Sequence, residues 1–325
     1  MKTLKRVLWG ILILLLSFLL IMSVPRILGV FMPGKAPIGY HFETLDYAAV
    51  YLGFEKAIDH NPAVPVNIKE IKNIEYKNIN GKSLQMDFYI PKNIKKPAPL
   101  IVFIHGGSWS HGKRSDYLVY LLHFASKGYI TATVSYRLID DATYPACVED
   151  IRDAVHWLFN NGEKYGYDPN RIALAGGSAG GHLALLGAYG WHKAGEPTDT
   201  IATEHKIKAV VDIYGPVDFT TEYARNQHLV NRFIAHPYSE KPELYVEGSP
   251  IQYLDRTDPP TMILHGTSDK LVPLSQSDTL KARLDRLGIP NQYCKVPLWP
   301  HAMDIVQRVN DYSKQQMEIF FKKYL

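Results

Sequence analysis

The segment Gly176-Gly177-Ser178-Ala179-Gly180 limits the possible folds of this chain more than any other feature of the sequence. It follows Arg171–Ala175, which predicts a strand, and it opens a predicted helix over Ser178–Tyr189. A serine placed between a strand and a helix lies on a sharp, strained turn, so its neighbours must be small enough for the chain to pass closely. The pattern G-x-S-x-G in this setting predicts an elbow that exposes the Ser178 side chain.

Strands and helices alternate on both sides of this elbow. Ile71–Ile79 and Leu84–Ile90 predict two strands joined at Asn80-Gly81, which is a strong hairpin signal. Further strands are expected at Leu100–Ile104, Tyr129–Tyr136, Arg171–Ala175, Ala209–Tyr214, Thr261–His265 and Gln292–Val296. Helices are expected at Ser115–Ser126, Pro145–Tyr165, Ser178–Tyr189, Ser275–Leu287 and Asp304–Tyr324. This order predicts an α/β domain with a mainly parallel sheet, an antiparallel edge hairpin and helices on both faces.

The N-terminus has a different character. Val7–Val24 contains no charged residue and is long enough to span a bilayer as a helix. Lys2, Lys5 and Arg6 precede it, which favours a cytoplasmic N-terminus with the rest of the chain translocated. No small-residue cleavage pattern follows, since Pro25-Arg26 come next. We therefore expect one uncleaved transmembrane helix, with secretion after signal-peptide cleavage as the alternative.

These features divide the chain into three parts. Residues 1–26 form a cytoplasmic tip and anchor, residues 27–70 a linker with a short helix near Tyr47–Ala57, and residues 71–325 the α/β domain. Within the domain, residues 220–258 are polar, aromatic-rich and poorly periodic. A long segment without clear strand character inside a compact domain is usually functional, so we expect a small cap insertion over the mouth of the site.

Composition narrows the possible partners. The 325 residues are 46% hydrophobic, which is sufficient for a full core, and the net charge is only +4. We find no concentrated basic stripe, so nucleic-acid binding is not expected. Cys147 and Cys294 lie in apolar segments and are expected to be small buried hydrophobic residues. The oligomeric state stays open.

A serine is a weak nucleophile, and it needs a base and an orienting acid. Asp269 comes shortly after the predicted strand Thr261–His265, and His301 follows the predicted strand Gln292–Val296. Because ligand-facing groups of a parallel sheet lie beyond the carboxyl ends of its strands, both side chains are expected at the same edge as Ser178. The order Ser178, Asp269, His301 predicts a catalytic triad.

Other carboxylates and histidines fit less well. Asp255 and Asp258 precede a strand, which places them at the opposite edge, and Asp304 is expected to cap the last helix. Structural packing is the expected role of three further histidines, His156, His182 and His265.

A second glycine motif follows the strand Leu100–Ile104. The sequence His105-Gly106-Gly107-Ser108-Trp109 is of the H-G-G-x type, whose backbone N–H groups face the elbow. We expect the N–H of Gly107, with that of Ser108 or Gly106, to form an oxyanion hole together with the N–H of Ala179. The residues that support the two motifs are His105, Gly106, Gly176 and Gly180.

From about Ile71 onward, the chain resembles the bacterial carboxylesterases related to hormone-sensitive lipase. The most similar pattern is the His-Gly-Gly-x-Trp subgroup, which includes feruloyl and acetyl-xylan esterases, kynurenine formamidase and prenylcysteine methylesterase. The resemblance implies the α/β-hydrolase fold, the triad Ser178, Asp269 and His301, and an oxyanion hole at Gly107 and Ala179. Ser108 departs from the third glycine of the lipase-like motif, which leaves open which loop amides donate. The motifs that carry the resemblance are His105–Trp109, Ser135–Arg137, Asp168–Arg171, Gly176–His182, His265–Asp269, Val272-Pro273 and Pro300-His301.

The expected activity is hydrolysis of small-molecule esters through an acyl-enzyme, a mechanism that needs no metal or organic cofactor. An amidase or peptidase on the same fold is the nearest alternative, because the triad does not identify the bond that is cleaved. A non-catalytic ligand binder is less favoured, since no triad member is missing. The acyl length, the alcohol group and the natural substrate stay open.

Overall fold

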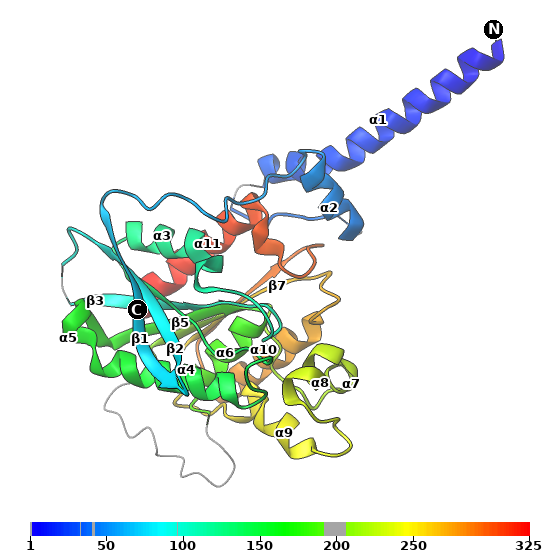
Figure 1. Ribbon diagram of the computed structural model, residues 1–325. Coiled ribbons are helices and arrows are strands. Elements are labelled where there is room, and N and C mark those ends of the chain that lie inside the picture. The colour runs from blue at the N-terminus through cyan, green and yellow to red at the C-terminus, as the bar shows by residue number, and fades with distance from the viewer. Residues whose placement is uncertain (1, 33, 41–42, 96, 192–205) are drawn as a thin grey trace.

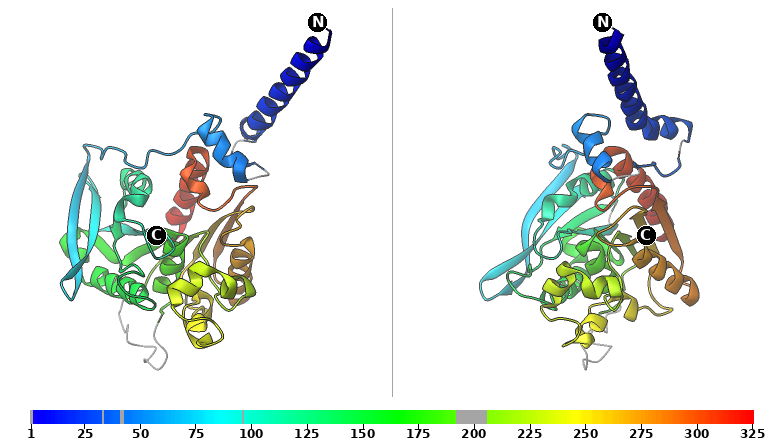
Figure 2. Two further views of the ribbon diagram at one scale, coloured as in Figure 1. Left: turned by 45° about the vertical axis from the view of Figure 1, so that its right-hand side comes forward. Right: turned by 90° about the vertical axis from the view of Figure 1, so that its right-hand side faces the viewer.

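The computed structural model describes residues 2–32, 34–40, 43–95, 97–191 and 206–325. A twisted sheet runs through the main body with helices on both of its faces, and a long N-terminal helix projects away from it (Figures 1 and 2). The predicted α/β architecture is confirmed, including the antiparallel edge.

Among the described residues, eight strands form one sheet in the order β1-β2-β4-β3-β5-β6-β7-β8. The hairpin pairs antiparallel and β2 is antiparallel to β4, whereas the other neighbouring strands are parallel. At the hairpin turn both Asn80 and Gly81 have positive φ, at 50° and 86°, as a type I′ turn requires. The strands are β1 (Ile68–Ile79), β2 (Lys82–Pro91), β3 (Ala98–Ile104), β4 (Ile130–Val134), β5 (Tyr167–Gly177), β6 (Ala209–Ile213), β7 (Thr261–Gly266) and β8 (Asn291–Val296).

Two hydrophobic cores cover the two faces of the sheet. In β3 the side chains alternate: Leu100, Val102 and Ile104 enter one core, whereas Ile101 and Phe103 enter the other. The first core also contains side chains of α4 (Ala146–Asn160), α6 (Ala179–Ala188) and α10 (Leu274–Leu287). The second contains those of α3 (Leu118–Ser126) and α11 (Gln307–Tyr324). Burial on both faces explains why the central strands are continuous apolar runs.

Several predicted boundaries are wrong. The helix expected over Pro145–Tyr165 ends at Asn160, and a separate turn, α5 (Gly162–Tyr165), follows it. Gly162 lies so close to the Tyr167 carbonyl that a Cβ there would collide with it. The last helix begins at Gln307 and not at Asp304, because a short 3-10 turn, η3 (Met303–Ile305), precedes it. Two other 3-10 turns occur earlier in the chain, η1 (Arg114–Tyr117) and η2 (Pro250–Gln252). The lead-in helix α2 is Glu43–Tyr51, and Gly53 at a φ of 79° prevents its continuation to Ala57.

Residues 220–258 form a cluster of short helices, coloured yellow in Figure 1. These are α7 (Glu222–Asn226), α8 (His228–Ile234) and α9 (Pro242–Glu247), followed by η2. Val230, Phe233 and Tyr245 from this cluster are buried in the same core as α4 and α6. The cluster is therefore packed onto the main domain.

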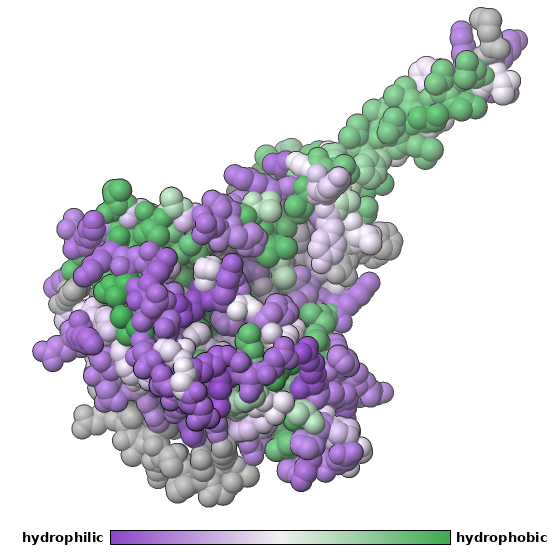
Figure 3. Space-filling model, viewed as in Figure 1, coloured by the Kyte–Doolittle hydropathy of each residue, from purple (hydrophilic) through white to green (hydrophobic). Residues whose placement is uncertain are grey.

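The N-terminal helix α1 (Lys2–Phe31) continues through Pro25. Within the described part of the chain, it is the one helix long and apolar enough to cross a membrane. Its side chains are largely exposed, and Figure 3 shows the projecting helix as mostly hydrophobic. The residues after α1 lie against the main body: the Gly39 N–H, for example, donates to the Pro297 carbonyl over 2.8 Å.

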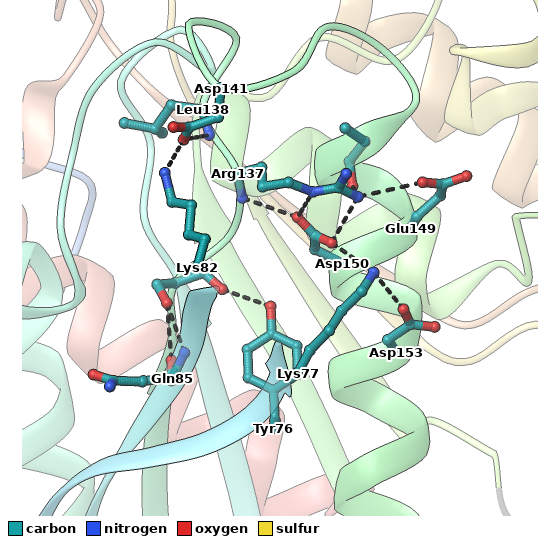
Figure 4. Close-up of polar contacts among 12 residues, drawn as sticks. Tyr76, Lys77, Lys82, Gln85, Arg137, Leu138, Asp141, Glu149, Asp150 and Asp153 are labelled. Carbon is teal, nitrogen blue, oxygen red and sulfur yellow. Dashed lines mark hydrogen bonds and ion pairs between the residues drawn. The ribbon is translucent and has the colours of Figure 1, made fainter. Parts of the chain in front are cut away.

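A buried carboxylate joins the edge hairpin to α4 (Figure 4). The fully buried Asp150 side chain accepts hydrogen bonds from Arg137 Nε (2.8 Å) and Nη2 (2.9 Å). Lys77 on β1 donates to the same carboxylate over 2.7 Å and also pairs with Asp153 on the helix surface. Two cations therefore neutralise one buried charge.

We expect Asp150→Ala to lower the free energy of unfolding by about 3–5 kcal/mol, because it removes the buried carboxylate that Arg137 and Lys77 share and leaves them only the more exposed Glu149 and Asp153. Asp140→Ala is the matched control, since Asp140 pairs with Arg232 while 73% exposed. Its effect should stay below about 1 kcal/mol. Urea denaturation of both variants measures the difference, and equal effects would contradict the role assigned to Asp150.

Candidate active site

Ser178 occupies the turn between β5 and α6, with φ at 56° and ψ at −125°. Non-glycine residues rarely adopt positive φ, so surrounding contacts must hold this conformation. The Ser178 N–H donates to the Ile213 carbonyl over 2.8 Å, and the His182 N–H donates to the Ser178 carbonyl over 3.0 Å. A Cβ at Gly176 would collide with the Gly180 backbone, and one at Gly180 would collide with the Ile104 carbonyl. Only glycines allow this close approach.

The structure brings Ser178, Asp269 and His301 together from the ends of three strands. His301 Nε2 lies 2.9 Å from Ser178 Oγ, and His301 Nδ1 lies 2.7 Å from Asp269 Oδ2. Both distances are within hydrogen-bond reach. The Asp269 side chain is fully buried, whereas the His301 side chain is 16% exposed. A proton can therefore move between Ser178 and an imidazole that Asp269 holds from behind.

Asp269 is held as an anion by its hydrogen bonds. Burial by itself raises the pKa of Asp269, but hydrogen bonds from His265 and His301 outweigh it and lower this pKa to about 2. The backbone N–H groups of Leu271 and Val272 donate to the other carboxylate oxygen, over 2.9 and 2.8 Å. The carboxylate is thus ionised throughout the neutral range.

His265 contributes more than the packing role predicted for it. It is fully buried, and its Nε2 lies 3.2 Å from Asp269 Oδ2 and 2.9 Å from the Val272 carbonyl. Its Nδ1 lies 2.6 Å from Ser277 Oγ. An Nε2–H tautomer, with Ser277 donating to Nδ1, satisfies all of these contacts. In the sequence, the position of His265 at the end of a strand, four residues before Asp269, could have indicated this contact.

The loop after β3 has an unusual backbone. Gly107, Ser108 and Trp109 all have positive φ, at 108°, 51° and 57°. A Cβ at Gly107 would collide with the His111 carbonyl, which explains the glycine. Within the described residues, the N–H groups of Gly107 and Ser108 donate no hydrogen bond. Ala179 is the first residue of α6, where helix N–H groups lack intrahelical partners.

His105 fixes the start of this loop. It is buried, its ring stacks on Tyr136 with 4.3 Å between centroids, and the Tyr136 hydroxyl donates to the His105 carbonyl over 2.8 Å. Burial lowers the pKa of His105, which favours a neutral ring. Gly106 packs against the Gly177 carbonyl, where a Cβ would lie only 2.7 Å away. Both residues therefore support the loop.

Trp109 joins the loop to the elbow and to the yellow helical cluster. Its indole N–H donates to His182 Nδ1 over 3.2 Å, and its ring stacks on Phe233 of α8 at 4.3 Å. His182 Nε2 in turn lies 2.8 Å from the Gly248 carbonyl. Burial lowers the pKa of His182 to about 4, so the ring is neutral and able to accept from Trp109. His182 is a buried packing residue, as expected.

A small cavity opens beside Ser178. It has about 20 Å³ of open volume, which is room for about one water molecule. The residues that line it come from the elbow, the loops after β3 and β6, the helical cluster and the loop that carries Asp269: Ser108, Trp109, Ser178, Pro216, Tyr223, Gln227, Leu229, Val230, Leu271 and Val272. The helical cluster thus covers one side of the nucleophile.

The alternative carboxylates lie elsewhere. Asp258 precedes β7 and accepts from the Asp255 N–H over 2.7 Å, at the opposite edge of the sheet. The prediction that Asp304 caps the last helix is wrong, because η3 turns its side chain inward. There it accepts hydrogen bonds from Tyr120, over 3.1 Å, and from Tyr214.

The sequence analysis did not predict that Tyr214 belongs to the site, where its ring packs against His301. Its ring centroid lies 4.7 Å from that of His301, and its own φ is 47°. Its hydroxyl bonds to Asp304, so a buried carboxylate fixes a ring that packs on the imidazole. Nothing in the local sequence around Tyr214 indicates this contact.

Across the described residues, no group of three His, Cys, Asp or Glu side chains is arranged to hold a metal ion.

The sequence is similar to several curated esterases. It is 32% identical over 223 residues to esterase LipC of Mycobacterium tuberculosis, which covers 65% of this chain and 54% of LipC. It is 27% identical over 217 residues to the isoprenylcysteine alpha-carbonyl methylesterase ICME of Arabidopsis thaliana, covering 63% and 50% of the two chains. The chain spans about half the length of the curated relatives it matches.

Solved structures show the same fold. A truncated carbohydrate esterase from gut microbiota superposes with a TM-score of 0.67 at 24% identity, covering 81% of this chain and 98% of that one. A propionate-bound esterase of Thermogutta terrifontis gives 0.68 at 21% identity, covering 82% and 97%. These likenesses establish the α/β-hydrolase fold.

The BD-FAE family model matches residues 86–284, which is more than half of the chain and includes Ser178 and Asp269. The resemblance predicted from the two glycine motifs is confirmed. The chain belongs to the BD-FAE family, on the α/β-hydrolase fold.

Proposed function

We propose that this protein is a serine carboxylesterase that hydrolyses small esters through an acyl-enzyme. The observation that carries the proposal is the hydrogen-bonded chain from Ser178 Oγ through His301 to Asp269, beside amides that have no partner in the described structure. The esterase relatives support it.

In the first step, Ser178 Oγ attacks the ester carbonyl while His301 Nε2 takes its proton. Asp269 has its pKa lowered to about 2 and is therefore ionised at neutral pH. It holds His301 in the Nδ1–H tautomer and stabilises the imidazolium that forms. The N–H groups of Gly107, Ser108 and Ala179 bind the negative oxygen of the tetrahedral intermediate. His301 then protonates the leaving alcohol.

In the second step, His301 Nε2 takes a proton from the water that attacks the acyl-enzyme, and it returns this proton to Ser178 Oγ as the acid product leaves. Each proton is transferred between Ser178, His301, the attacking water and the substrate, so this route needs no metal or organic cofactor.

We propose that residues 71–325 are the catalytic domain and that residues 220–258 act as its cap.

The side chains around Ser178 favour a small acyl group. Tyr223, Leu229 and Val230 of the cap line the small cavity beside Ser178. A long acyl chain would have to displace more of these side chains than an acetyl or propionyl group would.

We expect the purified protein to hydrolyse p-nitrophenyl acetate and butyrate, and Ser178→Ala to abolish this hydrolysis while the circular dichroism spectrum stays unchanged. The reason is that no other described hydroxyl lies within hydrogen-bond distance of His301 Nε2. Cleavage of p-nitroacetanilide at a comparable rate would indicate an amidase. Wild-type turnover by Ser178→Ala would exclude Ser178 as the nucleophile.

Asp269→Asn is expected to lower kcat by up to about 10⁴-fold, because an amide cannot hold His301 in the required tautomer. Asp258→Asn is the control and should leave kcat nearly unchanged, since Asp258 lies at the opposite edge of the sheet. Asp304→Asn should reduce kcat less than Asp269→Asn, because Asp304 acts on His301 only through the ring of Tyr214. Steady-state kinetics of the three variants decides between them. A larger loss in Asp304→Asn than in Asp269→Asn would overturn the assignment.

We further propose that α1 is an uncleaved membrane anchor with its N-terminus in the cytoplasm. Lys2, Lys5 and Arg6 precede its apolar stretch, and its side chains are exposed. Such an anchor would confine the enzyme near the membrane outside the cytoplasm.

N-terminal sequencing of protein from membranes should then find the chain intact. Protease added to cells stripped of any outer barrier should digest the catalytic domain while a cytoplasmic marker survives. A mature chain that begins shortly after Pro25 would indicate a cleaved signal peptide and secretion. A domain that resists protease until the cells are lysed would reverse the orientation.

A further inference from the structure

The segment between α1 and β1 contacts the loop that carries His301. We call residues 37–40 and 43–58 the strap, and residues 297–306, which carry His301, the His301 loop. Figure 2 shows the blue strap lying against the red C-terminal part of the chain. The strap precedes the region that the family model matches, which begins at residue 86.

The strap binds the His301 loop on the side that precedes His301. The Gly39 N–H donates to the Pro297 carbonyl over 2.8 Å, and the Trp299 indole N–H donates to the Pro37 carbonyl over 3.0 Å. A Cβ at Gly39 would lie 2.8 Å from the Leu298 carbonyl oxygen, so the two backbones are in close contact.

The other end of the strap binds the side that follows His301. Ala57 forms an antiparallel β-bridge with Val306. The Ile58 N–H donates to the Ile305 carbonyl over 2.9 Å, and the Gln307 N–H donates to the Lys56 carbonyl over 2.8 Å. The loop is therefore fixed at both of its ends by one segment.

One ion pair joins these two contact regions. Arg308 Nε lies 2.8 and 2.9 Å from the two carboxylate oxygens of Glu55, whose side chain is only 3% exposed. Arg308 Nη2 also donates to the Ile38 carbonyl over 2.7 Å. Its guanidinium lies 4.8 Å from the ring centroid of Trp299, two residues before His301. Bidentate pairing gives this contact a fixed geometry.

The His301 loop needs such support because its backbone is strained. Leu298 and Ala302, on either side of His301, have φ values of 63° and 56°. Non-glycine residues persist in this region only where the surrounding structure determines them. On the opposite side, the strap rests on α1, since the Tyr40 hydroxyl donates to the Met22 carbonyl over 2.7 Å.

We propose that Glu55 and Arg308 are positioning residues, which hold His301 in reach of Ser178 through the strap. This inference rests on the proposed function of the site. It adds the strap to the catalytic domain proposed above for residues 71–325, so that the functional unit begins at or before Pro37.

The test uses the full-length chain with Glu55→Gln and Arg308→Gln. Since small displacements of a catalytic group are costly, kcat should fall about 10- to 100-fold while KM changes less than about 3-fold, because neither residue lines the cavity beside Ser178. The double variant should lose little more than the worse single variant, since the two side chains act as a unit.

Hydrogen–deuterium exchange of peptides from the His301 loop gives a readout that does not depend on turnover. It should be faster in both variants than in the wild type. Lys77→Met is the control: it also removes a cation from a buried carboxylate, Asp150, but at the far edge of the sheet. It should lower the melting temperature without changing kcat or exchange in the His301 loop.

Wild-type kcat or wild-type loop exchange in Glu55→Gln, the milder variant, would overturn the inference. So would a loss of kcat no larger than that of Lys77→Met. If the wild type hydrolysed no ester, the proposed function would fail, and the exchange rates would still show whether the strap holds the loop.

Discussion

The backbone conformation at Ser178 is the constraint on which the rest of the site depends. Its φ of 56° and ψ of −125° cost of order 1–3 kcal/mol in an ordinary chain. The strain is sustained because β5 lies between β3 and β6, and because the Ser178 N–H is bonded to the end of β6. The glycines at 176 and 180 allow the neighbouring backbone to approach closely. The result is a hydroxyl fixed at the start of a helix, beside unpaired N–H groups.

Once that hydroxyl is fixed, a parallel sheet supplies its partners. β7 and β8 run in the same direction as β5, so the loops that follow them open at the same edge. The loop after β7 wraps its own amides around Asp269, and the loop after β8 carries His301. The imidazole then packs against Tyr214, which Asp304 holds from beneath. Each contact of the proposed triad is thus supported by a second contact with a buried group.

The sequence predicted the features that depend on local pattern. The elbow, the hairpin at Asn80-Gly81 and the position of Asp269 after a strand all follow from residues within a short window. The role of Asp304 could not be predicted, because its partner Tyr120 lies 184 residues away. The strap was predicted only as a linker, since Arg308 and the Ile38 carbonyl are 270 residues apart. Helical periodicity alone also did not predict that the long helix ends at Asn160 rather than at Tyr165.

The central claim is that the geometry at the elbow makes Ser178, and no other residue, nucleophilic. The most direct measurement is mass spectrometry of the full chain after reaction with a fluorophosphonate, followed by peptide mapping of the adduct. We expect one adduct per chain, located on the peptide that contains Ser178, and none after prior unfolding in urea. An adduct on another residue such as Ser108, or a folded protein that stays unmodified, would contradict it.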